Sequence, residues 1–404
     1  MNTLRAALSI FRTQGFGGLL RRVGERLSGT TGRAPSPVRR EDVLAVDWSV
    51  PHPAVTHPRT AKSGPLTVAW IMSRPGEASG GHQNIYRFIH YMEQAGHHVR
   101  IYLYNVERGI SIAQVKNMVR RSSSYPDLAA DVAFYPEGGV PSDTDAIVAT
   151  GWETAYAAFR DPSLARRFYF VQDFEPYFYP VGTDSVLAEN TYRFGFTGLT
   201  AGGWLAQKLS SEYGMETSAY EFGADPSNYS IVNDGPRREV FFYARPGTER
   251  RGFELGIMAL ELFSAAHPEY LINLAGWDVS RYKIPFAYRN LKTMPVGQLN
   301  EVYNRCAAGL VLSMTNMSLL PLELLAAGVI PAVNDGENNT MVSDNPFIEY
   351  TPASPKALAD RLAAIVERTD LPDYARKAAA SVADADWAKS GEQFLRSFER
   401  AMRS

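Results

Sequence analysis

Residues 319–334, with the sequence LLPLELLAAGVIPAVN, constrain the fold more than any other stretch of this chain. Pro321 can begin a helix, because the first helical positions need no backbone N–H donor and favour a φ of about −65°. Residues 322–327 have high helix propensity, and Gly328 can end the helix in the left-handed conformation. The apolar residues 329–333 then predict a strand. The stretch therefore predicts a short helix followed closely by a buried strand.

The residues before this helix predict the rest of an α/β unit. Residues 309–312 are expected to form the buried end of a strand, and the polar run 313–318 a loop. Backbone amides around residues 318–320 would lie at a helix N-terminus, which favours an anion such as a phosphate. Glu323, one turn into the helix, would then face a bound ligand. The same spacing also fits an ordinary α/β unit with a surface glutamate, so both interpretations stay open.

Length and composition are those of a globular protein with two or three domains. The 404 residues are 45% hydrophobic and 21% charged, and the net charge of −2 argues against bulk attraction to nucleic acid. The single cysteine, Cys306, excludes an intrachain disulfide framework and a metal site of several cysteines, and it predicts a reducing, cytoplasmic compartment. No run of about 18 apolar residues is present, so we expect no membrane-spanning helix.

Residues 1–62 differ from the rest of the chain. In residues 1–27, apolar residues are interleaved with five arginines against one glutamate. This basic amphipathic pattern fits peripheral contact with an anionic membrane surface, and it fits a helix packed on the body of the protein equally well. Residues 28–62 are rich in Pro, Arg, Ser and Thr and are predicted to be a linker.

The first domain is predicted to open with a βαβ unit. Residues 66–72 predict a strand, residues 82–95 a helix and residues 99–104 a second strand, so a parallel sheet is expected. The connecting loop ends in Gly80 and Gly81, without the glycine spacing of a dinucleotide site. These glycines either form a plain tight turn or let the backbone approach a sugar or phosphate closely.

Residues 167–172 predict another strand, and the segment QDFEPYFYP follows directly from Gln172. In open α/β sheets, ligands bind at this carboxyl edge. Asp173 and Glu175 lie among aromatic residues, where burial can raise the pKa of a carboxyl group for acid–base work. Tyr177 and its neighbours can stack on a sugar ring. The alternative is an aromatic loop that closes the sheet, with Asp173 as a cap.

A polar, turn-rich break at residues 233–238 marks the predicted domain boundary. The second half repeats the pattern, with a strand at residues 240–244, an arginine-rich loop at residues 245–252 and a helix at residues 253–265. Arginines at such a junction suit a diphosphate, because a guanidinium group can bind two phosphate oxygens at once. A solvated charged loop fits the same residues. Two such domains would leave a cleft between them.

The order and spacing of these segments resemble the GT-B glycosyltransferases of family 4, and within them the bacterial rhamnosyltransferases of the WsaF type. The resemblance covers roughly residues 65–400. It rests on segments in both halves of the chain: Gly80-Gly-His-Gln-Asn, Gln172-Asp-Phe-Glu-Pro, Thr191-Tyr-Arg-Phe-Gly-Phe, Ala244-Arg-Pro-Gly-Thr-Glu-Arg-Arg-Gly, Gly276, Gln298-Leu-Asn-Glu-Val-Tyr, Leu320-Pro-Leu-Glu-Leu-Leu-Ala-Ala-Gly-Val-Ile-Pro and the helix at residues 387–402.

The resemblance implies an α/β fold of the GT-B type, in which two Rossmann-like domains face each other across a cleft. It implies an N-terminal acceptor domain over residues 63–234 and a C-terminal nucleotide-sugar donor domain over residues 235–385. A C-terminal helix over residues 386–404 is expected to cross back to the first domain.

The resemblance also implies a donor site in the second domain. The arginine and lysine with which the family holds the diphosphate correspond to Arg245 and Arg251, and arginine keeps the charge of lysine. Of the family's two glutamates that contact the donor, Glu323 matches the second. Thr315 stands in place of the first, so a charged contact with the sugar hydroxyls is lost. The further donor-binding positions are Ser318, Leu319 and Leu320.

In the first domain the resemblance implies acceptor or sugar contacts at Gly80, Gly81, Gln172 and Tyr177. Gln172 stands where the family often has a histidine, so this position cannot carry a proton. Asp173 or Glu175 is then the catalytic candidate, unless the reaction needs no protein base.

The implied function is retaining transfer of L-rhamnose from dTDP-L-rhamnose onto a growing bacterial polysaccharide or glycan, with a lipid-linked acceptor among the options. We expect no metal and no cofactor beyond the donor substrate, because no metal-ligand constellation is evident and arginine can supply the positive charge. A sugar-nucleotide epimerase and a non-catalytic glycan-binding protein are the alternatives. A cytoplasmic protein with peripheral contact at the inner face of the membrane through residues 1–27 fits these expectations.

Overall fold

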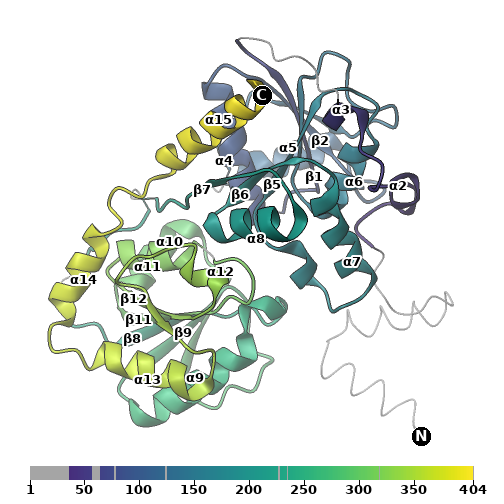
Figure 1. The fold of residues 1–404 in the computed structure, drawn as a ribbon. Coiled ribbons are helices and arrows are strands. Elements are labelled where there is room, and N and C mark those ends of the chain that lie inside the picture. Colours follow the sequence, from purple (N-terminus) through teal and green to yellow (C-terminus); the bar gives the residue numbers. More distant parts are fainter. Residues whose placement is uncertain are drawn as a thin grey trace, which may run out of the picture.

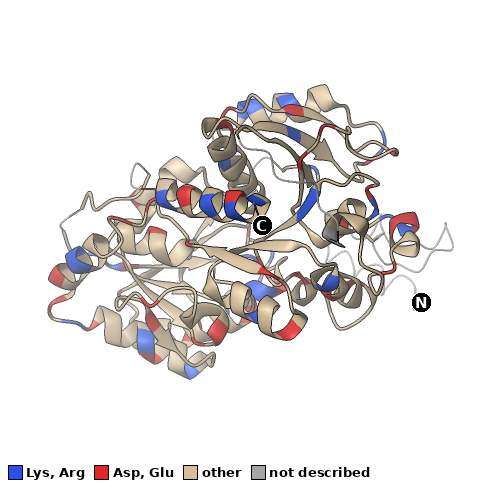
Figure 2. Ribbon diagram, turned by 45° about the horizontal axis from the view of Figure 1, so that its top comes forward, with Lys and Arg blue, Asp and Glu red and all other residues tan. Residues whose placement is uncertain are grey.

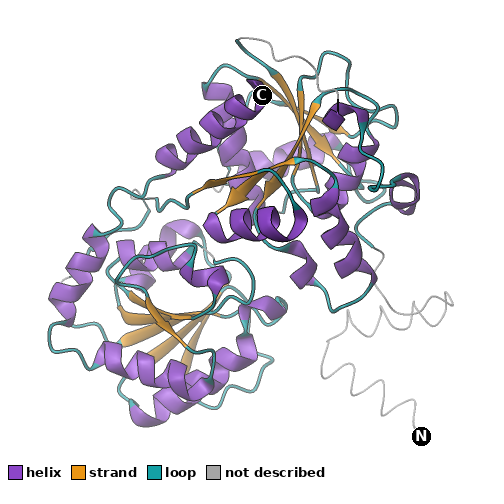
Figure 3. Ribbon diagram, viewed as in Figure 1, coloured by secondary structure: helices purple, strands orange, loops and turns teal. Residues whose placement is uncertain are grey.

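Two parallel sheets with helices around them form the body of the protein, as the computed structural model shows (Figures 1 and 3). The described residues are 36–56, 64–76, 79–122, 125–225, 228–233, 235–317 and 319–403. The expectations for residues 1–27 and for Ser318 lie outside these ranges.

The first sheet has the strand order β3-β2-β1-β4-β5-β6-β7, and every neighbouring pair is parallel. The order reverses between β1 and β4, which lie side by side. Its strands are β1 (Thr67–Met72), β2 (His98–Leu103), β3 (Asp131–Phe134), β4 (Ala146–Ala149), β5 (Arg166–Val171), β6 (Thr197–Ala201) and β7 (Thr217–Tyr220).

The helices of the first domain bury apolar faces against this sheet. Helix α4 (Gly80–Gln94) shows why: its buried residues recur at helical spacing, and Ser79 caps its first turn by accepting a hydrogen bond from the His82 amide. The other helices of this domain are α5 (Ile112–Arg121), α6 (Trp152–Arg160), α7 (Thr183–Asn190) and α8 (Gly203–Tyr213), with the 3-10 turns η1 (Glu175–Phe178) and η2 (Thr191–Arg193).

The second sheet has the order β10-β9-β8-β11-β12-β13, again with parallel pairs. Its strands are β8 (Glu239–Tyr243), β9 (Leu271–Ala275), β10 (Tyr288–Lys292), β11 (Cys306–Val311), β12 (Ile330–Asn334) and β13 (Glu349–Thr351). The helices that cover it are α9 (Phe253–Ala266), α10 (Val296–Tyr303), α11 (Leu320–Ala326), α12 (Glu337–Thr340), α13 (Pro355–Val366) and α14 (Leu371–Ala380), with the 3-10 turn η3 (Glu249–Arg251).

The stretch from which the sequence analysis began folds as predicted. Pro321 lies in the first turn of α11, and Gly328 follows the helix with a φ of +72°. Added bulk at Gly328 would also meet Ile231, whose Cδ1 would lie 2.9 Å from a Cβ atom there. A glycine is therefore required both by the backbone conformation and by the space available.

The long C-terminal helix α15 (Trp387–Arg403) packs on α4, β6 and β7 of the first domain (Figure 1). Gly391 makes this packing close, because a Cβ atom there would lie 2.5 Å from the ring of Tyr91. The fold therefore confirms the predicted pair of Rossmann-like domains with a helix that returns to the first.

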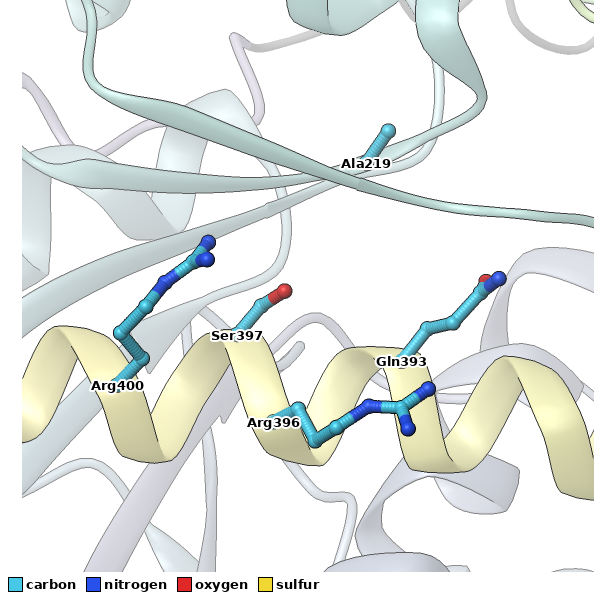
Figure 4. A pocket seen from close by; sticks show the side chains of 5 residues that line it. All are labelled: Ala219, Gln393, Arg396, Ser397 and Arg400. Atoms are coloured by element: carbon cyan, nitrogen blue, oxygen red, sulfur yellow. The ribbon is translucent and has the colours of Figure 1, made fainter.

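A groove of about 440 Å³ lies between α15 and the edge strand β7. In Figure 4 the side chain of Arg400 points from the helix toward the strand, whereas Arg396 extends along the helix. Arg400 donates a hydrogen bond to the Ser218 hydroxyl at 3.2 Å. The lining residues are Ala219, Gln393, Arg396, Ser397 and Arg400.

Part of the predicted linker is structured. Of residues 28–62, the structure describes 36–56, and these form α2 (Arg40–Ala45) and α3 (Pro53–Thr56). The buried carboxylate of Asp42 accepts hydrogen bonds from Tyr104 at 2.6 Å and from Arg160 at 2.6 Å. These partners lie far along the chain, so a composition rich in Pro, Arg, Ser and Thr could not reveal the docking.

Candidate active site

The loops that follow β8 and β11 meet at one edge of the second sheet. These two strands are neighbours, and the strand order reverses between them. Such a reversal opens a crevice at the carboxyl ends of the strands, where open α/β sheets bind ligands. Residues 244–252 enter this crevice from β8, and residues 312–317 enter it from β11. The segments that the sequence analysis assigned to the donor therefore converge.

Three arginines of the first of these loops lie together. Arg245 donates to the Tyr243 hydroxyl at 3.0 Å, and its guanidinium carbon lies 5.9 Å from the ring centre of Trp277. Arg251 donates to the Ser313 hydroxyl at 2.9 Å. Burial lowers the pKa of Arg251, and the charges of Arg250 and Arg245 lower it further, while Asp173 opposes them. The three guanidinium groups therefore form a cluster of positive charge at this edge of the sheet.

The absence of a side chain at Gly276 leaves room for the side chains of Tyr243 and Arg245. It has a φ of +108°, and a Cβ atom there would lie 2.6 Å from the Tyr243 ring and 3.2 Å from Cδ of Arg245. A larger residue would be strained at this φ and would require the Tyr243 ring and the Arg245 side chain to shift.

Asparagine side chains hold the second loop rigidly from below. The Ser313 amide donates to Asn334 Oδ1 at 2.8 Å, and the Asn334 amide group returns a hydrogen bond to the Ser313 carbonyl at 3.0 Å. Asn338 and Asn339 donate to the same carbonyl at 3.0 and 3.1 Å. These side-chain hydrogen bonds satisfy backbone groups that have no partner in a helix or a strand. They therefore hold the loop in one conformation.

Asp173 joins this loop from the first domain. Its Oδ1 accepts hydrogen bonds from the amides of Phe174 at 2.9 Å and of Asn316 at 2.8 Å. Its Oδ2 accepts one from the Thr315 hydroxyl at 3.0 Å and lies 3.5 Å from Nε of Arg250. Asp173 and Thr315, predicted for opposite sides of the cleft, are therefore in direct contact.

Glu323 lies half-buried in the first turn of α11. It accepts a hydrogen bond from the Tyr303 hydroxyl at 3.5 Å. Burial raises its pKa to about 7, against the opposing effects of Tyr229, Tyr303 and the charge of Arg87. Arg87 belongs to α4 of the first domain, and its guanidinium group stacks on the Trp387 ring at 4.0 Å. The structure thus places Glu323 where both domains and the return helix meet.

Leu319 and Leu320 lie at the start of α11, as predicted. The Leu319 carbonyl accepts the amides of Leu322 and Glu323, so the amides of residues 319 and 320 precede the helix ladder. Because α11 has only seven residues, its dipole is short and most of the charge at this site comes from the arginines.

On the first domain, Gly81 and Gln172 lie together. A Cβ atom at Gly81 would lie 3.6 Å from Nε2 of Gln172, whereas Gly80 faces open space. Tyr177 is 54% exposed, and its ring centre lies 4.7 Å from that of Phe174. The aromatic loop therefore presents an exposed tyrosine ring, which suits contact with a sugar.

Glu175 is buried behind this loop. It accepts hydrogen bonds from the Trp152 amide at 2.6 Å and from the Tyr169 hydroxyl at 3.1 Å. Burial raises the pKa of Glu175 well above its ordinary value, and the neighbouring carboxyl of Glu153 raises it further. The catalytic assignment of Asp173 and Glu175 stays a prediction, although each carboxyl group already has several protein donors.

The sequence analysis did not single out several residues that complete the site. Arg250 was visible only as one charge among others, and its guanidinium carbon lies 3.9 Å from the ring centre of Phe178 across the domains. Asn316 carried no signal, because its partners are backbone carbonyls of the other domain. The other missed residues are Arg87, Tyr229, Tyr303, Asn334, Asn338 and Asn339.

Lysine, arginine, aspartate and glutamate residues are spread over the elements of both domains (Figure 2). The described residues contain no group of three or more His, Cys, Asp and Glu side chains arranged to hold a metal ion. None of the helices in the described ranges has the length and apolar character to cross a bilayer. The groove beside α15 contributes no residue to the crevice.

Comparison with known proteins supports the family resemblance. Two family models match, described as "WsaF, C-terminal domain" over residues 238–363 and "WsaF, N-terminal domain" over residues 138–199. The chain is 34% identical over 305 residues to the O-antigen biosynthesis protein RfbC of Myxococcus xanthus. This match covers 71% of the chain but only 23% of that much longer relative.

Solved structures of low sequence identity share the fold. A variant of TarM from S. aureus, determined with UDP, has a TM-score of 0.66 at 8% identity and covers 84% of this chain and 100% of that one. WaaG, described as a glycosyltransferase involved in lipopolysaccharide biosynthesis, has a TM-score of 0.57 at 13% identity and covers 81% of this chain and 98% of that one. The chain therefore carries segments that match both WsaF domain models, and it has the GT-B fold.

Proposed function

We propose that this protein is a glycosyltransferase that moves a sugar from a nucleoside diphosphate donor to a glycan acceptor. The observation that carries the proposal is the cluster of Arg245, Arg250 and Arg251 at the reversal point of the second sheet, facing the carboxyl edge of the first sheet. Such a cluster fits a diphosphate, because guanidinium groups bind phosphate oxygens with two parallel hydrogen bonds.

In the proposed reaction the arginines act on the leaving group. Negative charge develops on the diphosphate as its bond to the sugar breaks, and guanidinium groups fixed beforehand stabilise that charge at no cost of rearrangement. Arg251 is fixed by Ser313, and Arg245 by Tyr243. The amides of Leu319 and Leu320 add polar contacts to the diphosphate, and Glu323 accepts hydroxyl groups of the donor. We propose that the sugar is transferred with retention of its anomeric configuration.

The acceptor enters from the first domain in this proposal. Gly80 and Gly81 allow close approach, Gln172 offers an amide, and the exposed ring of Tyr177 offers a face for a sugar ring. The contact between the domains at Asp173 excludes water from the space between them, which protects the donor from hydrolysis.

We propose dTDP-L-rhamnose as the donor and a growing bacterial polysaccharide, free or lipid-linked, as the acceptor. The match to WsaF-type domains supports the donor, and the relative named for O-antigen biosynthesis supports the acceptor. Thr315 in place of a glutamate leaves the sugar hydroxyls without a charged contact, which suits a deoxy sugar with fewer hydroxyl groups to bind; the Thr315 hydroxyl itself is buried and donates to Asp173 at 3.0 Å.

The test is a transfer assay with purified full-length protein. We expect incubation with dTDP-L-rhamnose and a rhamnose-ended acceptor to lengthen the glycan by one residue, with the donor's anomeric configuration in the product by NMR. Inversion of a stereocentre in the sugar of the nucleotide sugar, in the absence of an acceptor, would indicate an epimerase instead. Glycan binding that survives Arg245→Ala and Glu323→Gln, without transfer from dTDP-, UDP- or GDP-sugars, would indicate a binding protein.

A further inference from the structure

A chain of hydrogen bonds runs from the first domain to an arginine of the donor crevice. Asp173 Oδ1 accepts the Asn316 amide at 2.8 Å, and the Asn316 carbonyl accepts the Ser313 hydroxyl at 2.6 Å. The Ser313 oxygen accepts Nη1 of Arg251 at 2.9 Å. Asp173, Asn316 and Ser313 are buried, whereas Arg251 is only partly buried. A carboxylate of one domain is thus connected through three contacts to a guanidinium group of the other.

The same loop is anchored to the first domain by further contacts. The Asn316 side chain donates to the carbonyls of Gln172 at 3.1 Å and of Ala201 at 2.8 Å, at the carboxyl ends of β5 and β6. The Thr315 hydroxyl donates to Asp173 at 3.0 Å. The tip of the loop is therefore held by the first domain, while the asparagines of the second domain hold its base.

We propose that Asp173 is a positioning residue for the donor site, acting through Thr315, Asn316 and Ser313 on Arg251. The proposal rests on the proposed function, since it assigns Arg251 to the donor diphosphate. Closure of the two domains completes the chain, so the donor site reaches its full affinity only when the first domain is in contact with the loop.

The surroundings of Asp173 favour this role over that of a general base. A general base must present an oxygen atom to the hydroxyl group that it deprotonates. Both oxygens of Asp173 already accept from protein donors, and the residue is 8% exposed. A carboxylate whose oxygens are both occupied in this way holds the groups that donate to it in fixed positions.

Coupling between the domains follows from the positions of these contacts. The loop has neither a helix nor a strand between β11 and α11, so its conformation depends on its side-chain contacts at both ends. Loss of the acceptor at Asp173 Oδ2 leaves the Thr315 hydroxyl and Arg250 without this partner and loosens the tip of the loop, which also carries the Asn316 carbonyl that accepts the Ser313 hydroxyl. The expected effect is weaker donor binding, with the chemistry itself left intact.

The experiment compares four variants of the full chain. Asp173→Asn places an amide group against Thr315 and Arg250, Thr315→Val removes the hydroxyl, and the double variant combines them. Asp145→Asn is the matched control, because Asp145 is a buried carboxylate that accepts the Thr67 amide at 2.9 Å at the opposite edge of the same sheet. Thermal unfolding confirms that each variant is folded before it is used.

The first readout needs no ligand. Amide hydrogen exchange of the peptide that spans residues 311–320 is expected to rise in Asp173→Asn and in Thr315→Val, and to stay unchanged in Asp145→Asn. The two single changes remove parts of the same contact, so the double variant is expected to exchange no faster than the more affected single variant.

The second readout is the split between KM and kcat with dTDP-L-rhamnose. We expect the donor KM of Asp173→Asn and of Thr315→Val to rise about 10-fold, the effect of one lost hydrogen bond to a charged group, with kcat within about threefold of the original. The dissociation constant of dTDP, measured by calorimetry, is expected to rise in parallel.

A different result overturns the inference in a recognisable way. If Asp173→Asn lowers kcat by about 100-fold or more at unchanged donor KM, while Thr315→Val behaves as the original protein, Asp173 is a base and not a positioning residue. Unchanged exchange at residues 311–320 in both single variants also refutes it. If the original protein binds neither dTDP nor UDP, GDP or ADP, the proposed function fails and the inference falls with it, whatever the variants do.

Discussion

Single residues decide the charge of the crevice. Arg245, Arg250 and Arg251 lie on one loop, and the carboxylate of Asp173 pairs with Arg250 from the other domain. The three arginines outnumber the carboxylates of Asp173 and of Glu249 on the same loop, so an anionic ligand would be attracted to this edge of the sheet.

We expect Arg245→Ala to raise the donor KM by about 10- to 100-fold, because a hydrogen bond between charged groups is lost. The unfolding temperature is expected to change little, since Arg245 bonds only to the Tyr243 hydroxyl at the surface. Initial rates with dTDP-L-rhamnose measure the effect. Arg376→Ala is the control, because Arg376 pairs with Asp373 on α14 far from the crevice. An unchanged KM would remove Arg245 from the donor site.

Glu323 gives a pH dependence of stability. The folded protein holds the proton of Glu323 up to about pH 7, whereas the unfolded chain releases it near pH 4.5. Stability is therefore lost as the pH rises through this window, because the native state binds more protons than the unfolded state there. Tyr229, Tyr303, Arg87 and Asp225 are the polar groups that act on it.

We expect Glu323→Gln to remove this loss. The difference in unfolding temperature between the variant and the original protein should grow in favour of the variant from pH 4.5 to pH 7, as measured by calorimetry at several pH values. A difference that stays constant over the window would show that the Glu323 proton leaves at its ordinary pKa.

The sequence predicted which loops of the candidate site meet, because the position of such a loop depends only on the strand that it follows. Arg251 follows β8, and Ser313 follows the neighbouring strand β11, so the reversal of strand order brings these two loops into contact. Asn316 and Arg87 were not predictable, because their partners belong to the opposite domain. No local pattern encodes a contact that exists only after two domains dock.

Among the elements, long periodic segments were predicted well. The predicted helix over residues 253–265 is α9, and the predicted strand over residues 240–244 is β8. The edge strands β10 and β13 were not predicted. Strand β10 has the sequence YRNLK and is only partly buried, so it lacks the apolar run by which a central strand is recognised.

Helix α9 packs on the sheet through a glycine. A Cβ atom at Gly256 would overlap the ring of Phe242, which is buried in β8. We expect Gly256→Ala to lower the free energy of unfolding by about 1–3 kcal/mol, because the ring has no room to move in a packed core. Denaturant titration measures this.

Gly297→Ala in α10 is the matched control, because nothing lies within 4 Å of a Cβ atom there. It should leave the stability unchanged or raise it by up to about 1 kcal/mol, since alanine favours the helix. Equal effects of the two changes would mean that α9 does not pack on β8 as closely as described.

At the scale of the whole molecule, the chain passes between the two domains twice, near residues 223–224 and near residues 386–387. These two connecting segments lie side by side. Ala224 and Asp386 form a parallel bridge, and a Cβ atom at Gly223 would lie 2.7 Å from the Trp387 amide nitrogen. The return of α15 to the first domain was predictable from the family resemblance. The pairing of the two crossings was not, because it depends on backbone contacts between residues far apart in the chain.

We expect transfer to proceed without a divalent metal, since the arginines supply the positive charge that a metal would otherwise supply. The rate with dTDP-L-rhamnose should stay within about twofold after treatment with EDTA and removal of the chelator. Activity that disappears with EDTA and returns with Mg²⁺ or Mn²⁺ would refute this expectation.

The most direct test of the diphosphate site is a crystal structure of the protein with dTDP bound. The account predicts that diphosphate oxygens lie within hydrogen-bonding distance of Arg245 and Arg251, between the ends of β8 and β11. Nucleotide density elsewhere, for instance beside Arg396 and Arg400 in the groove along α15, with the crevice empty, would contradict it.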